Sequence, residues 1–122
     1  MPFTCKVGDS FYLPDNNGRH RWIILTKPNS SGYVVIVNFT DANNLDCSVI
    51  FAPGDHNPFS LRTTICCEKA TLVLESKLRI LKVVDYIYFN ERQVEKIIKG
   101  VIGSTHTPLD ILTELNDQSP NY

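Results

Sequence analysis

The sequence lacks the features that most readily assign a protein to a class. It has no strong excess of charge, since 12 Lys and Arg stand against 13 Asp and Glu for a formal net charge of −1. Composition alone therefore does not indicate a nucleic-acid binder, although a local basic cleft is compatible with it. The sequence also lacks an apolar run of signal-peptide or membrane-spanning length. We expect a cytoplasmic protein with no membrane association.

The spacing of the cysteines indicates neither a disulfide framework nor a metal site. The 4 cysteines include no C-x-x-C pair, the usual sign of a structural zinc site. Cys66 and Cys67 are adjacent, and neighbouring side chains of a strand point to opposite faces. We therefore expect reduced thiols, no bound metal and no other cofactor.

Two apolar runs of strand-forming residues dominate the first third of the chain. They occupy residues 22–25 and 34–37, and a segment rich in Pro, Asn, Ser and Gly separates them. This pattern predicts a β-hairpin at the centre of a small sheet. Antiparallel pairing of the two runs would bring Arg21 close to Thr40 at one end of the hairpin.

Further β-prone segments are predicted to extend this sheet, at residues 10–13, 47–51, 63–67, 72–74 and 78–84.

Two helices are predicted to follow these strands. Asn90 and Gln93 form a capping-box pattern, which is followed by an apolar stripe at 94, 97, 98 and 101. Thr107 and Pro108 predict the start of a second helix, packed through Leu109, Leu112 and Leu115.

The order of these elements predicts an α+β, mostly β fold: a small curved antiparallel sheet or SH3-like barrel with C-terminal helices. With 122 residues, the chain is expected to form one domain. We divide it into a barrel over about 1–89, helices over about 90–116 and a tail over 117–122.

Three segments together resemble the MazF/PemK family of toxin endoribonucleases: Gly8-Asp9, RWIILT at 21–26 and VVIVNFT at 34–40. Members of that family have a Gly-Asp turn, then an apolar strand led by Arg-Pro, then a strand that ends in Ser or Thr. The resemblance covers roughly the first two thirds of the chain, and Trp22 stands where the family has proline. It implies an SH3-like barrel that forms a homodimer, cuts single-stranded RNA without a metal and is inhibited by an antitoxin protein.

The catalytic Arg and Ser/Thr of the family correspond to Arg21 and Thr40. Metal-independent RNA cleavage needs groups that move protons and donors that hold the charged phosphorane. Arg21 and Thr40 could supply the donors, and His20 and His56 are candidate acid-base groups because histidine titrates near neutral pH. The expected RNA-contacting residues are Arg19, Trp22 and Arg62.

Two other interpretations are compatible with the sequence. The first is a non-catalytic SH3-like binding module, or an inactive toxin homologue, that binds a protein partner; the charge balance and the missing proline favour it, and Arg21 would then simply flank a strand. The second is a thiol-based redox or metal protein that depends on Cys66 and Cys67. It has less support because neither cysteine has an activating neighbour in the sequence.

Overall fold

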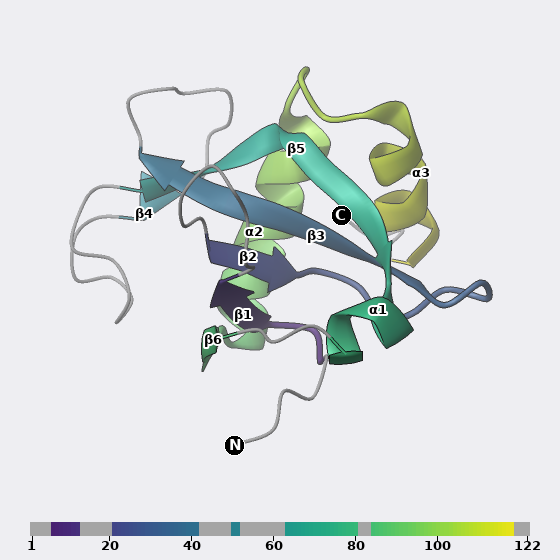
Figure 1. The fold of residues 1–122 in the computed structure, drawn as a ribbon. Helices are drawn as coiled ribbons and strands as arrows, with labels where there is room; N and C mark the ends of the chain where they lie inside the picture. The colour runs from purple at the N-terminus through teal and green to yellow at the C-terminus, as the bar shows by residue number, and fades with distance from the viewer. Residues whose placement is uncertain (1–5, 13–20, 42–49, 52–62, 81–83, 119–122) are drawn as a thin grey trace.

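The computed structural model describes residues 6–12, 21–41, 50–51, 63–80 and 84–118. They form an α+β, mostly β structure, which confirms the predicted fold class (Figure 1). The strands are β1 (Asp9–Tyr12), β2 (Arg21–Ile24), β3 (Tyr33–Asp41), β4 (Ile50–Phe51), β5 (Thr63–Leu74) and β6 (Val84–Tyr88). The helices are α1 (Glu75–Ile80), α2 (Glu91–Gly103) and α3 (Leu109–Gln118).

The strands form one curved antiparallel sheet in the order β4-β5-β3-β2-β1-β6. The long strands β3 and β5 cross the molecule side by side, and β4 and β6 lie at the two edges (Figure 1). Within the described segments the sheet is therefore open. Of the two forms expected from the sequence, this is the curved sheet and not the closed barrel.

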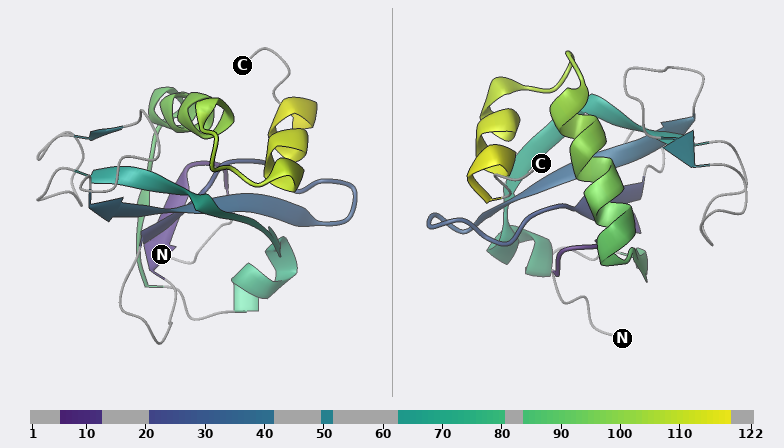
Figure 2. Two further views of the ribbon diagram at one scale, coloured as in Figure 1. Left: turned by 90° about the horizontal axis from the view of Figure 1, so that it is seen from above. Right: turned by 180° about the vertical axis from the view of Figure 1, so that it is seen from behind.

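Helices cover both faces of the sheet. Figure 2 shows α2 and α3 against one face and α1 against the other. On β3, Val35, Val37 and Phe39 belong to the core on the α2 side, whereas Val34 and Ile36 belong to the cluster on the α1 side. Burial on both faces explains why the apolar run in β3 shows no alternation with polar residues.

The predicted central hairpin is confirmed. β2 and β3 pair with Trp22 opposite Asn38, Ile23 opposite Val37 and Ile24 opposite Ile36. The connecting loop is stabilised by the Asn29 side chain, whose Oδ1 accepts hydrogen bonds from the backbone N–H groups of Ser31 and Tyr33. This is a common role of asparagine in turns.

The Gly8-Asp9 turn joins three parts of the fold. Gly8 has a φ of 95°, its N–H donates to the Ile24 carbonyl at 2.9 Å, and its carbonyl accepts from the Phe89 N–H at 2.7 Å. A Cβ at this position would overlap the Phe89 carbonyl oxygen. Asp9 closes the turn by accepting a hydrogen bond from the Lys6 N–H. Only glycine meets both the conformational and the steric requirement here.

Two predictions about the second half of the sheet are wrong. Of the predicted strand over 78–84, residues 78–80 belong instead to the helix α1, in which Leu78 is buried against the sheet and Arg79 pairs with Glu75 at 2.8 Å across one helical turn. Residues 81–83 lie outside the described residues, and β6 begins at Val84. The segments 63–67 and 72–74, predicted as two strands, are two parts of the single strand β5. A register shift opposite Ile36 and Asn38 separates these two parts.

The capping box of α2 is confirmed. Asn90 Oδ1 accepts from the Gln93 N–H and Gln93 Oε1 accepts from the Asn90 N–H, both at 2.9 Å. The predicted apolar stripe of this helix, at residues 94, 97, 98 and 101, is buried in the core. Among the described residues, no helix is both long and apolar enough to cross a membrane.

The second predicted helix, α3, is also present, but it packs differently from the prediction. Ile111 and Leu115 are its buried residues, whereas Leu109 is 78% exposed. The Thr107 hydroxyl donates to the Val101 carbonyl at 2.6 Å, at the end of α2. Thr107 therefore uses its hydroxyl to close the preceding helix.

Candidate functional site

Arg21 and Thr40 lie at the same end of β2 and β3, but on opposite faces of the sheet. Arg21 lies on the same face as Ile23, which belongs to the core on the α2 side. Phe39 also belongs to that core, so the adjacent Thr40 lies on the α1 side. The two side chains therefore do not face one groove, as a shared catalytic role would require.

The Arg21 side chain is buried between β2 and β1. The residue is 4% exposed, its Nη1 donates to Ser10 Oγ at 3.0 Å, and its guanidinium carbon lies 4.7 Å from the centroid of the Tyr12 ring. Ser10 Oγ in turn donates to the Ile87 carbonyl at 2.6 Å. Arg21 thus contributes to a polar network that links β2, β1 and β6. This arrangement does not present its guanidinium at the surface for a phosphate.

Of the other predicted site residues, the structure describes Trp22 and Thr40. Trp22 is partly buried against the cluster on the α1 side, which is a packing role. The RNA-binding candidates Arg19 and Arg62 and the acid-base candidates His20 and His56 lie outside the described residues. Of the predicted constellation, the structure places only Arg21, Trp22 and Thr40, and it brings Trp22 and Thr40 to the same face.

Asn38 is a polar position that the sequence analysis did not select. It lies in β3 between Trp22 of β2 and Cys66 of β5 and is 5% exposed. Its Oδ1 is buried and has no hydrogen-bond partner among the described residues. A buried acceptor left unpaired costs about 1 to 3 kcal/mol. The available sequence signal was a single asparagine that directly follows the apolar run of this strand.

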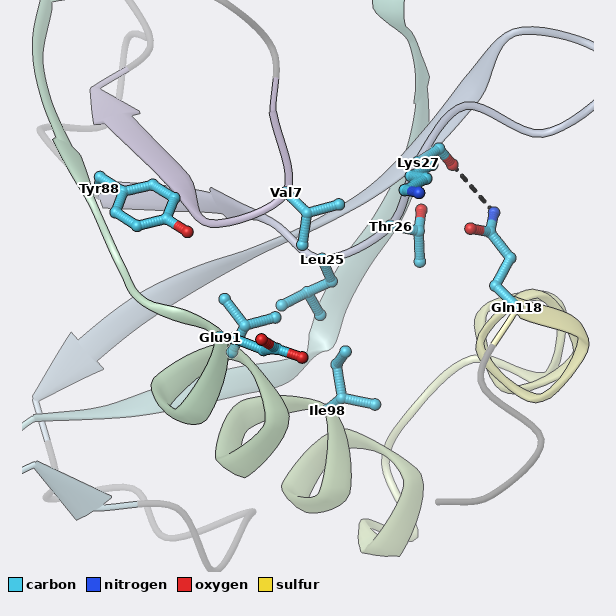
Figure 3. A pocket seen from close by; sticks show the side chains of 9 residues that line it. Val7, Leu25, Thr26, Lys27, Tyr88, Glu91, Ile98 and Gln118 are labelled. Atoms are coloured by element: carbon cyan, nitrogen blue, oxygen red, sulfur yellow. Dashed lines mark hydrogen bonds between the residues drawn. The ribbon is translucent and has the colours of Figure 1, made fainter.

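A pocket of about 430 Å³ lies between the end of β2, the start of α2 and the end of α3 (Figure 3). This volume falls in the range of about 300 to 1,000 Å³ found for ligand sites. Apolar side chains form its floor: Val7, Leu25, Val94 and Ile98. Polar side chains surround the floor: Thr26, Lys27, Tyr88, Glu91 and Gln118. We call this site the Lys27/Glu91 pocket.

The two charged side chains of the pocket come from elements far apart in the sequence. Glu91 is the first residue of α2, and its side chain extends over the apolar floor (Figure 3). Lys27 follows β2 and lies beside Thr26 at the other side of the pocket (Figure 3). In the described part of the chain, neither charged group has a hydrogen bond or an ion pair. Both are thus available to a bound molecule.

The remaining polar groups of the pocket are held in place by contacts within the protein. Gln118 Nε2 donates to the Lys27 carbonyl at 2.9 Å and to Glu114 Oε2 at 2.8 Å. Glu114 Oε1 accepts from Asn29 Nδ2 at 3.0 Å. These bonds attach the end of α3 to the β2–β3 loop, so the Lys27 side of the pocket has a defined wall.

Tyr88 forms the opposite side of the pocket. It is 54% exposed, and Lys6 Nζ lies 5.7 Å from its ring centroid. Figure 3 shows its ring and hydroxyl on the same side of the pocket as Glu91. This side therefore combines an aromatic ring with a carboxylate, the two group types that attract cations.

The described residues contain no group of three or more His, Cys, Asp or Glu that could hold a metal ion. Cys66 and Cys67 are both buried, and Cys67 lies in the core on the α2 side. Neither of these two cysteines therefore presents an exposed thiol for a redox function.

Comparison of the chain with protein-family models, with curated proteins and with solved structures finds no match. The resemblance to MazF/PemK toxins therefore stays a prediction.

Proposed function

We propose that this domain is a non-catalytic binding module that holds a segment of a protein partner in the Lys27/Glu91 pocket. The observation that carries this proposal is an apolar floor beneath two oppositely charged side chains that have no partner in the described part of the chain. Sites of this kind gain affinity from burial of apolar surface and specificity from a few polar groups. The protein is proposed to act in the cytoplasm.

The surroundings of Arg21 also favour binding over catalysis. A guanidinium that stabilises a phosphorane must reach the position where charge develops. The Arg21 guanidinium instead donates to Ser10 and lies over Tyr12, on the face opposite Thr40. Releasing it would leave Ser10 Oγ without this donor and would expose a buried side chain.

Selection of peptides from a random library displayed on phage tests the proposal. Enriched peptides are titrated against the wild type, against Val7→Trp, which fills the pocket, and against Leu109→Ser, which removes an exposed apolar side chain outside it. We expect Val7→Trp to weaken binding at least 10-fold, since the larger side chain occupies the space in which an apolar group of the peptide would be buried. Leu109→Ser is expected to bind as the wild type does.

The controls for this selection are the folding of both variants and the site dependence of binding. Thermal unfolding shows whether Val7→Trp and Leu109→Ser are folded at the temperature of the titration. Failure to enrich any peptide, or equal binding by folded Val7→Trp and wild type, would refute the binding module at this site.

A divergent MazF/PemK-like endoribonuclease is the second candidate, with single-stranded RNA and an antitoxin as partners and a homodimer as its assembly. The Gly8-Asp9 turn and the β2–β3 hairpin favour it, because the resemblance rests on these segments. Incubation of the purified protein with single-stranded RNA and a chelator tests this activity, and light scattering tests the dimer. Intact RNA after incubation with a folded sample would exclude the endoribonuclease.

A further inference from the structure

The two sides of the Lys27/Glu91 pocket differ in chemistry. Figure 3 shows Tyr88 and Glu91 on one side and Lys27 and Gln118 on the other, with the side chains of Val7, Leu25 and Ile98 between them. One side therefore offers the Glu91 carboxylate, on the same side as a Tyr88 ring whose centroid lies 5.7 Å from Lys6 Nζ, and the other side offers the Lys27 ammonium group. An occupant that satisfies both sides has an apolar middle and opposite charges at its ends.

We infer that the occupant is a peptide segment in which an apolar side chain lies between a basic and an acidic residue. This inference rests on the proposed function and specifies the partner. The basic residue pairs with the Glu91 carboxylate beside Tyr88, the apolar side chain covers the floor, and the acidic residue pairs with Lys27.

Electrostatic complementarity carries this assignment. Glu91 and Lys27 have no ion pair in the described part of the chain, although Glu95 and Lys99, one and two turns further along α2, pair with each other at 3.5 Å. A purely apolar ligand would displace water from the Glu91 carboxylate without pairing with it, and this loss of hydration is costly. A ligand of a single charge would meet one like charge in the pocket.

The orientation of the segment follows from the fold. Tyr88 and Glu91 belong to the β6–α2 junction, which the Asn90 capping box holds in place. Lys27 belongs to the β2–β3 loop, and its backbone carbonyl accepts a hydrogen bond from Gln118 of α3. Because hydrogen bonds fix both of these backbone segments, the points from which the two charged side chains extend are defined before the peptide binds.

Calorimetric titration with synthetic peptides tests the inference. The peptides are acetylated and amidated, so that their ends carry no charge, and contain a lysine, a leucine and a glutamate with varied spacing. The comparison peptides have the lysine, the glutamate or both replaced by glutamine, or the leucine replaced by serine. We expect each lost charge to weaken binding by about 2- to 5-fold, the range for exposed ion pairs, and the effect to shrink at high salt.

A charge exchange in the protein gives the sharpest form of this test. The Lys27→Glu/Glu91→Lys double variant keeps the net charge and is expected to prefer the peptide in which lysine and glutamate have exchanged places. The single variants Lys27→Gln and Glu91→Gln should each become insensitive to one peptide charge only. Lys99→Gln, on the exposed surface of α2, is the matched control and should not alter peptide preference.

The possible outcomes distinguish the binding module itself from the assignment of charges to its peptide. If uncharged leucine peptides bind as well as charged ones and Val7→Trp still abolishes binding, the binding module stands and the charge assignment is refuted. If the doubly exchanged variant keeps the wild-type preference, the charge assignment is likewise refuted. If no peptide binds, both are refuted.

Discussion

Arg21 Nη1 donates a 3.0 Å hydrogen bond to Ser10 Oγ, and this contact holds the guanidinium against β1, on the face opposite Thr40. Ser10 and Arg21 are both buried. We therefore interpret Arg21 as a structural residue. Its role can be tested by stability measurements that do not depend on any activity.

Arg21→Ala is expected to lower the free energy of unfolding by about 2 to 4 kcal/mol, because it removes a buried charged donor and the packing of its side chain on Tyr12. Urea unfolding measures the change. Arg79→Ala is the matched control: its exposed pair with Glu75 should contribute less than about 1 kcal/mol. Equal effects of the two substitutions would contradict a structural role for Arg21.

Gly8→Ala is expected to destabilise the fold by about 2 kcal/mol or more, since the new Cβ would overlap the Phe89 carbonyl oxygen in a backbone conformation with φ of 95°. Gly103→Ala provides the comparison, because nothing lies within 4 Å of a Cβ there. In α2 this substitution should stabilise by about 0.5 to 1 kcal/mol. Opposite signs for the two changes in thermal unfolding would confirm the role of the turn, and a neutral Gly8→Ala would contradict it.

Asn38→Val is expected to raise the free energy of unfolding by about 1 kcal/mol, because it replaces an unpaired buried acceptor with a strand-forming apolar residue. Chemical denaturation measures the change. A loss of stability would show that the Asn38 side chain makes favourable interactions that outweigh the cost of its unpaired Oδ1.

Leu78→Ala is expected to cost about 2 to 5 kcal/mol, since Leu78 is fully buried where α1 packs on the sheet. Ile80, in the same helix, is 81% exposed, so Ile80→Ala should change the stability by less than about 0.5 kcal/mol. Similar effects at both positions would contradict the packing of α1 described above.

Local signals explain which elements could be predicted from the sequence. The hairpin followed from two β-branched runs around a turn, and α2 followed from the Asn90 capping box and its apolar stripe. Helix α1 could not be predicted this way. Its six residues contain one buried side chain, Leu78, and its position depends on packing against the sheet.

The candidate site was less accessible to prediction because it depends on register and on contacts between distant segments. With Trp22 opposite Asn38, Thr40 falls on the face away from Arg21, and a shift of one residue would reverse that relationship. The Lys27/Glu91 pocket is formed by residues from Val7 to Gln118, and no short motif unites them. Only the folded chain places these residues together.

The most direct test of the binding module is the location of a bound peptide by NMR. The sample is the full chain with labelled methyl groups, saturated with a selected peptide. We expect intermolecular nuclear Overhauser effects between the apolar side chain of the peptide and the methyl groups of Val7, Leu25, Val94 and Ile98. Contacts confined to methyl groups outside the pocket, such as those of Ile80 or Leu109, would contradict the proposed site.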